Sequence, residues 1–549
     1  MNNVEFNLID EPWIRVMDNE CKMSEVSLKD VILNAHRYKS LSGELPTQDI
    51  ALMRLILAVL HTVYSRVDEN GDDALLDDED EDEAIDRWKA LWGKGRFSEK
   101  AISEYFDKWH ERFWLFHTDR PFGQVAGLKI GTRNSAQKLN GEISQSLNSK
   151  RWFSLYSGIA KESLTYSQAA RWLIYLNGYD DVALKPTKEG REKAAGKLPS
   201  AKRGWLGQLG LIYMVGDNLF ETLMLNLVMV CNGVVQSNQK PLWETDYLSI
   251  KERQLIPTPD NLAELYTMQF RFILLERKED RVIGYLNVAG FFFGEDVSFK
   301  EPMTIWKQKE EHSTEMIPKK HDPTKQMWRE FSSIINAELP KASDSQKKVQ
   351  KHNEKAEVLK WYVKHNVRNK KEIQVSVVSL VYDESKTTSL PVKNVFCDSL
   401  IMHSDLLTNL GADWRNTIEQ EINRCSQLAN AAAFLAQNLY VASGGSKSDK
   451  DKHYKKLPDI VKSQIYYRFD VPFRKWLRTI DPENYDEKQK YNKQREWQEM
   501  ARKIAESYAY ELVSETDDSA IVGHKVDNTI YSSSKAMIIF RGQLNKIYT

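Results

Sequence analysis

A strongly basic loop is the stretch of this sequence whose residue types are best suited to chemistry. Between Ala183 and Trp205 the sequence ALKPTKEGREKAAGKLPSAKRGW holds seven Lys or Arg side chains, two acids and three glycines. Lys and Arg neutralise phosphate charge on a nucleic-acid backbone, and glycine permits a close approach of the chain to a ligand. A solvated surface excursion has the same composition, so both interpretations stay open. Apolar segments on either side, SQAARWLIYLNGYD and GWLGQLGLIYMV, would hold the ends of the loop.

Sequence motifs for catalysis are missing. The chain contains no GxxxxGK[ST], HExxH or GxSxG pattern, and GGSKS at 444–448 lacks the spacing of a phosphate loop. The dipeptide His321-Asp322 stands alone, whereas a nuclease surrounds its metals with several carboxylates or histidines. Four cysteines without a CxxC pair argue against a structural zinc site. We therefore predict no catalytic residue, no metal site and no cofactor.

The overall charge limits where a positive site can be. The 549 residues carry a formal net charge of -1, so the molecule is not a general polycation and any basic site must be local. Neither a secretory leader nor an uninterrupted apolar stretch of membrane-spanning length occurs. Together with the cysteine usage, this predicts a cytoplasmic protein without a membrane partner.

The elements that must position the basic loop are expected to form an α+β fold. The segment 51–67 is apolar on all sides and predicts a buried helix. The acidic run at 72–86 is expected to be an exposed connection. Alternation within 268–297 predicts strands joined by a charged turn, and 375–385 predicts a further strand.

The last third of the sequence has a different, helical pattern. From Leu407 apolar residues recur every three or four positions until Gly444 and Gly445, which indicates one long amphipathic helix. Further helical patterns cover about 457–480, 486–513 and 530–548. The predicted architecture is a large mixed α/β domain over 1–400, followed by a four-helix bundle over 401–549.

Six short motifs together resemble the CasA family, the large subunit of the type I-E CRISPR Cascade complex. In chain order they are FNLIDEPWIRV (6–16), RPFGQV (120–125), AARWLIYLNGYD (169–180), KRGWLGQLG (202–210), GDNLFETLMLNL (216–227) and EPMTIWK (301–307). The resemblance implies a binding protein, not an enzyme. In that family the subunit recognises the protospacer-adjacent motif in double-stranded DNA, helps to open the duplex, stabilises the R-loop and recruits a helicase-nuclease. Its implied partners are crRNA, the backbone and small subunits of Cascade, target DNA and the helicase-nuclease effector.

The resemblance also implies site residues. The family's loop enters the minor groove through a glycine-rich turn, which corresponds here to Val182, Ala183, Leu184 and Lys185, so the glycines are replaced. Lys185, Lys188 and Arg191 would contact DNA phosphates. The turn at 382–389 corresponds to a wedge under the first base pair, with Lys386, Thr387 and Thr388 as its DNA-binding residues and Thr387 in place of a family glutamine.

A second implied element contacts the guide and the DNA. It is the loop of 154–167 with the aromatic residues before it, and its candidate contacts are Trp152, Phe153, Tyr156 and Lys161. Ordinary core packing would also account for these aromatic side chains. Two other functions remain as alternatives: a metal-dependent nuclease subunit, and a scaffold that uses its basic loops only for RNA.

Overall fold

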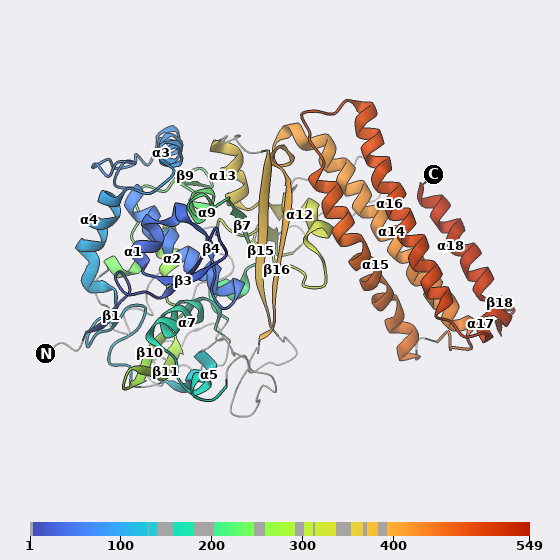
Figure 1. Ribbon diagram of the computed structural model, residues 1–549, viewed down its shortest axis with the longest axis horizontal. Helices are drawn as coiled ribbons and strands as arrows, with labels where there is room; N and C mark the ends of the chain where they lie inside the picture. Colours follow the sequence, from blue (N-terminus) through green and yellow to red (C-terminus); the bar gives the residue numbers. More distant parts are fainter. Residues whose placement is uncertain are drawn as a thin grey trace. The chain divides into compact units, whose positions relative to one another are not determined.

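The chain forms two compact units of mixed helix and strand (Figure 1). The computed structural model describes residues 4–129, 131–139, 157–180, 203–245, 259–290, 301–310, 313–335, 353–365, 371–382, 392–448 and 450–548. Unit 1 comprises 1–324, 337–367 and 374–399, and unit 2 comprises 325–336, 368–373 and 400–549. The α+β class is confirmed, whereas a domain boundary at residue 400 stays a prediction.

Helix α2 (Pro46–Tyr64) forms the centre of unit 1. Proline stands in its first turn, where an amide N–H has no helical partner to lose, and every side chain from Ile50 to Tyr64 is buried. The helix packs against α7 (Tyr166–Tyr179) and α11 (Leu262–Thr267). The predicted buried helix is confirmed, although it begins at Pro46 and ends at Tyr64.

The acidic run is partly helical, which corrects the expectation of an exposed connection throughout. Helix α3 (Glu81–Lys94) starts inside it, and the side chain of Asp80 caps this start by accepting a hydrogen bond from the Glu83 amide at 3.0 Å. Carboxylates in a first helical turn interact favourably with the partial positive charge of the helix N-terminus. The charge run therefore starts a helix whose inner face is buried. Other helices of unit 1 are α1 (Leu28–Leu33), α4 (Glu99–Trp109), α9 (Leu219–Asn226) and α13 (Glu357–His365).

Small sheets surround these helices. The sheet β10-β11-β6 joins Arg271–Lys278, Arg281–Ala289 and Thr132–Ser135, with Arg271 opposite Ala289 in the antiparallel register of β10 and β11. This confirms the predicted strands and their charged turn. The sheet β16-β15-β7 joins Val392–His403, Glu372–Tyr382 and Leu211–Val215. A third sheet, β3-β2-β4, joins Met23–Val26, Ile14–Asp18 and Tyr38–Leu41.

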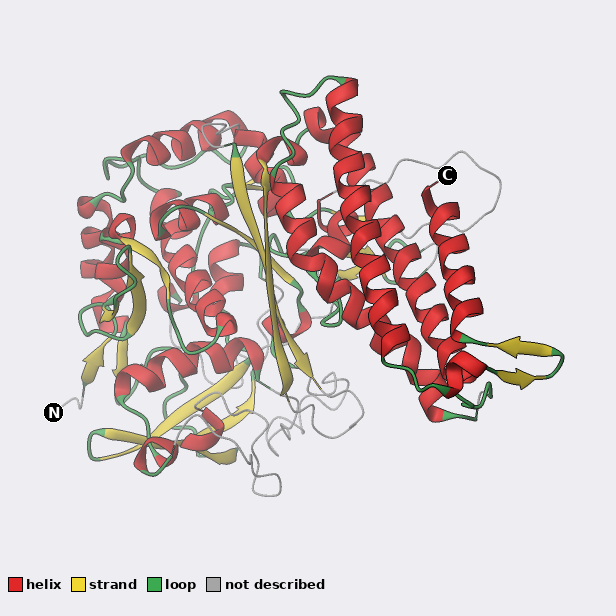
Figure 2. Ribbon diagram, turned by 45° about the vertical axis from the view of Figure 1, so that its right-hand side comes forward, coloured by secondary structure: helices red, strands yellow, loops and turns green. Residues whose placement is uncertain are grey.

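Long helices dominate the described part of unit 2. They are α14 (Ala412–Ala442), α15 (Lys452–Arg478), α16 (Glu487–Ser514) and α18 (Ser533–Tyr548). Helix α14 packs against the other three, which run beside it in Figures 1 and 2. Aromatic rings fill part of the core: Trp328 stacks on Phe473 with ring centroids 4.3 Å apart, and Phe473 meets Trp497 edge-on at 5.0 Å. The four predicted helical segments are confirmed, and their folding as an independent bundle stays a prediction.

A buried histidine in α2 predicts acid sensitivity. Burial lowers the pKa of His61 to about 3, and among the described residues its Nε2 has no hydrogen-bond partner. The neutral form is favoured in the folded state, whereas the unfolded chain takes up a proton below its ordinary pKa of about 6.5, so stability falls as the pH drops below that value. We expect about 2 kcal/mol of unfolding free energy to be lost through this group between pH 7 and pH 5.

On acidification from pH 7 to pH 5, the variant His61→Leu should lose about 2 kcal/mol less unfolding free energy than the parent. Urea denaturation at the two pH values measures this difference. The matched control is His453→Leu, which removes a histidine from the exposed surface of α15 and not from the core. Equal acid losses in the parent and in His61→Leu would contradict the role of this histidine.

Candidate nucleic-acid interface

Most of the sequence-predicted contacts lie outside the described residues, and the structure describes the points where their segments attach. The residues outside are Val182, Ala183, Leu184, Lys185, Lys188, Arg191, Lys386, Thr387, Thr388, Trp152, Phe153 and Tyr156. Lys161 is described, and its half-buried side chain lies on the short helix α6 (Ile159–Glu162). The segments of interest are therefore 140–156, 181–202 and 383–391, and their attachment points are all in unit 1.

Asp180 anchors the basic segment 181–202 at its start. It follows helix α7, which begins with a capping box between Thr165 and Gln168. The Asp180 side chain is completely buried and pairs with Arg271, which is equally buried, at 2.9 Å from Nε to Oδ2. Asn287 donates a second hydrogen bond to the same oxygen at 2.9 Å. A buried charge of this kind is tolerated only when it is paired, so the two strands β10 and β11 fix the end of α7.

The far end of the basic segment returns to the same residue. The amide of Gly204 donates a hydrogen bond to the backbone carbonyl of Asp180 at 3.1 Å. A Cβ at position 204 would overlap the Gly178 carbonyl, so only glycine fits this close approach. Both ends of 181–202 are thus tied to one buried aspartate.

A second buried ion pair supports the chain that follows. The indole of Trp205, in the 3-10 turn η3 (Trp205–Gln208), donates to Glu301 Oε2 at 3.2 Å. Glu301 also receives two hydrogen bonds from the Arg54 guanidinium, at 2.6 and 2.9 Å. Burial by itself would lower the pKa of Arg54, but the Glu301 carboxylate outweighs it and raises that pKa. This arginine stays charged and is held inside unit 1.

The strand before 383–391 reaches the same place. Tyr382, the last residue of β15, donates its hydroxyl hydrogen to the Tyr179 carbonyl at 2.5 Å. The guanidinium of Arg203 lies over the Tyr382 ring, 5.1 Å from its centroid. The attachment points of the basic segment and of the predicted wedge therefore meet.

The third segment, 140–156, attaches nearby. Helix α5 (Ala136–Leu139) ends just before it and packs against α6, α7 and β11. After it, Leu164 pairs through its backbone with Val282 of β11. Arg281 of the same strand donates to the Ser163 hydroxyl at 2.6 Å. All three segments therefore attach to the fold beside α7 or β11.

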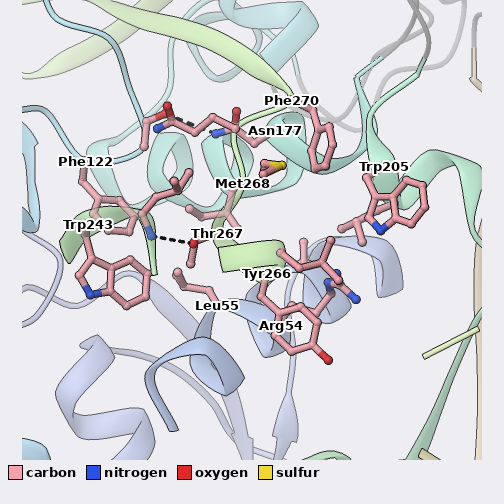
Figure 3. A pocket seen from close by; sticks show the side chains of 18 of the residues that line it. Arg54, Leu55, Phe122, Asn177, Trp205, Trp243, Tyr266, Thr267, Met268 and Phe270 are labelled. Atoms are coloured by element: carbon pink, nitrogen blue, oxygen red, sulfur yellow. Dashed lines mark hydrogen bonds between the residues drawn. The ribbon is translucent and has the colours of Figure 1, made fainter. Parts of the chain in front are cut away.

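A cavity of about 110 Å³ lies beside these anchors (Figure 3). Asn177 from α7, Trp205 from η3 and Tyr266 from α11 contribute to its wall, which is largely apolar and aromatic. Arg54 also lines it, stacked 4.1 Å from the Tyr266 ring centroid and neutralised by Glu301. Such a wall suits packing, and the charge of Arg54 is already neutralised inside unit 1.

The described ranges offer neither a metal cluster nor a membrane-spanning helix. Within them no group of three or more His, Cys, Asp and Glu side chains is placed to hold a metal ion. His321, singled out by sequence, is buried with its Nε2 3.1 Å from the Leu211 carbonyl. Over the same residues no helix combines the length and the apolar character needed to cross a bilayer.

Sequence reasoning missed the buried anchors. Asp180, Gly204, Trp205 and Glu301 all belong to the motifs quoted above, but their pairing with Arg271 and Arg54 was not foreseen. The available signal was the presence of charged residues inside apolar segments, as Arg271 in QFRFILL. A charge in such a setting is rarely left without a buried partner.

Comparison with known proteins assigns the chain to a family. A family model described as CRISPR-associated protein Cse1 matches residues 7–508. The CRISPR-associated protein CasA/Cse1 of Thermus thermophilus is 28% identical over 337 residues. That alignment covers 60% of this chain and 60% of the relative, which is less than two thirds of its length.

Solved structures show the same fold. Thermobifida fusca Cse1 matches with a TM-score of 0.80 at 24% identity, covering 100% of this chain and 98% of that one. A chain of a structure described as a CRISPR RNA-guided surveillance complex matches with a TM-score of 0.68 at 16% identity, covering 99% of each. Because the family model spans nearly the whole sequence, this chain belongs to the CRISPR-associated protein Cse1 family, as its resemblance to CasA predicted.

Proposed function

We propose that this chain is the large subunit of a type I-E CRISPR RNA-guided surveillance complex. In this role it recognises the protospacer-adjacent motif in double-stranded DNA, helps to open the duplex, stabilises the R-loop and recruits a helicase-nuclease. The observation that carries the proposal is the common attachment of the predicted DNA-contacting segments at Asp180, Arg203 and Tyr382, in a chain of the Cse1 family. The relative described as part of an RNA-guided surveillance complex supports the assembly with crRNA and further subunits.

Each segment has a distinct task in this proposal. Lys185, Lys188 and Arg191 neutralise phosphates and so set the register on the duplex, while the turn at 182–185 lies against the minor groove. Lys386, Thr387 and Thr388 occupy the space of the first base pair as it unstacks. Trp152, Phe153, Tyr156 and Lys161 contact the guide and the DNA, the aromatic rings by stacking on bases.

The crRNA supplies sequence specificity by base pairing, and the protein reads only the short adjacent motif and the shape of the backbone. The partners are then crRNA, the backbone and small subunits, target DNA and the helicase-nuclease effector. We place the complex in the cytoplasm, in keeping with the free thiols at positions 21, 231, 397 and 425.

Copurification and a cleavage assay test this proposal together. Coexpressed with the other subunits and a crRNA, the chain is expected to appear in the native mass spectrum of one assembly. Supplied with Mg²⁺ or Mn²⁺ and ATP but without the helicase-nuclease, that assembly is expected to leave bound DNA uncut. Metal-dependent cleavage that survives stringent purification would favour the nuclease alternative. An assembly that holds crRNA but gains no DNA binding from this chain would favour the RNA scaffold.

A further inference from the structure

Tyr382 touches both ends of the basic segment. Its hydroxyl donates to the Tyr179 carbonyl at 2.5 Å, and its ring faces the Arg203 guanidinium at 5.1 Å. Tyr179 stands two positions before residue 181, and Arg203 directly follows residue 202. Tyr382 itself directly precedes the segment 383–391, so one side chain joins the attachment points of two proposed DNA-contacting segments.

The surroundings hold this tyrosine in one position. The side chain is 5% exposed, and burial raises the pKa of its hydroxyl well above the usual value, so the group stays a neutral hydrogen-bond donor. Gly207 faces the hydroxyl, and a Cβ there would overlap it. Next to it, Asp180 is fixed by Arg271 and Asn287. The contact is therefore made between rigid, buried groups.

The DNA-contacting residues of both segments are only a few residues away from this contact along the chain. Lys386 is four residues from Tyr382, so its Cα lies within about 14 Å of it even in a fully extended chain. Lys185 is six residues from Tyr179, which limits that separation to about 21 Å. DNA rises by about 3.4 Å per base pair, so both segments reach base pairs that lie close together.

We propose that Tyr382 is a positioning residue. It couples binding of the basic segment (181–202) to duplex DNA with strand separation by the wedge segment (383–391). This inference rests on the proposed function. Phosphate contacts made at 185–191 hold the middle of that segment on the duplex, while its ends stay fixed at Asp180 and Tyr382, so the start of 383–391 takes a defined position relative to the bound duplex. Loss of the hydroxyl leaves DNA binding by the cations intact but lets the wedge segment start from a less defined position.

The test compares Tyr382→Phe with the parent chain in the assembled complex. A single buried hydrogen bond corresponds to about a threefold to tenfold effect, so we expect opening of a fully paired target to slow by that factor. Opening is followed by the fluorescence of 2-aminopurine placed in the first target base pairs. Binding to a target with a pre-opened bubble at those pairs should stay unchanged, and the salt dependence of duplex binding should also stay unchanged.

Two further variants separate coupling from loss of structure. Gly207→Ala places a methyl group against the Tyr382 hydroxyl and should reproduce the effect of Tyr382→Phe on opening. Tyr213, half-buried on β7 opposite Ser376, is the control, and Tyr213→Phe should leave opening unchanged. Equal losses on duplex and bubble, or equal slowing in Tyr213→Phe, would overturn the coupling.

A double-mutant comparison distinguishes failure of this inference from failure of the proposed function. When Lys185, Lys188 and Arg191 are replaced by Ala, the basic segment no longer seats, so adding Tyr382→Phe should slow opening less than it does in the parent. Full additivity of the two changes would overturn the coupling alone. A triple Ala variant with unchanged duplex affinity and unchanged salt dependence would overturn the proposed function and, with it, the coupling.

Discussion

Replacing Arg271 with Met is expected to destabilise unit 1 by about 3–5 kcal/mol, the usual cost of removing one partner from a buried ion pair. The Asp180 carboxylate would keep the hydrogen bond from Asn287 but lose its countercharge in a place without access to water. Because Asp180 also receives the Gly204 amide, the loss should be greatest where the basic segment attaches.

Hydrogen exchange read by mass spectrometry on peptides from β10, β11 and α7 measures this local stability. Arg133→Met is a matched control, since Arg133 lies on β6 of the same sheet and its pair with Glu276 is exposed on the arginine side. Such a surface pair contributes at most about 1 kcal/mol. Similar exchange in the two variants would contradict the anchoring role of the Asp180–Arg271 pair.

The second large effect is expected from the basic segment. Replacing Lys185, Lys188 and Arg191 by Ala should reduce the slope of log affinity against log salt by up to about 0.9 for each phosphate that is no longer contacted. If all three side chains contact phosphates in the parent, a fourfold rise in salt should cost the variant complex about 40-fold less affinity for duplex DNA than it costs the parent. The variant should also bind more weakly at low salt, where released counterions contribute most.

The measurement is equilibrium binding of the assembled complex to target DNA over a salt series. A control with the same change in net charge replaces Lys89, Lys94 and Lys108 by Ala on α3 and α4, where all three side chains are exposed. Its salt slope should equal that of the parent. An unchanged slope in the Lys185, Lys188 and Arg191 variant would remove phosphate contact from the role of this segment.

Much of the fold follows from local sequence patterns. Helix α2 is apolar on every side, β10 and β11 are apolar runs on either side of a charged turn, and α14 repeats apolar residues every three or four positions. Each of these patterns lies within a single helix or strand, so it can be recognised without knowing what that element packs against. The acidic run was predicted less well from its local sequence. Capping by Asp80 and burial of the helix face that carries Arg87 make part of the expected loop the start of α3.

The anchors of the candidate site were not predictable in the same way. Asp180 and Arg271 are 91 residues apart, and Arg54 and Glu301 are 247 apart. Nothing in the local sequence says which buried acid pairs with which buried base, since that depends on how helices and strands pack. The motif residues were recognisable through the family resemblance, but their task of fixing segment ends became visible only in the structure.

Selection from a DNA library shows whether this chain recognises a protospacer-adjacent motif. Target DNA with randomised bases beside the crRNA-complementary sequence is offered to the complex assembled with this chain, with its Lys185, Lys188 and Arg191 triple Ala variant, or without the chain. We expect the complete complex to enrich a short adjacent motif, the triple variant to bind the same motif more weakly, and the complex without the chain to enrich none. Recovery of the same motif with equal yield in the absence of the chain would show that this chain does not recognise the adjacent motif.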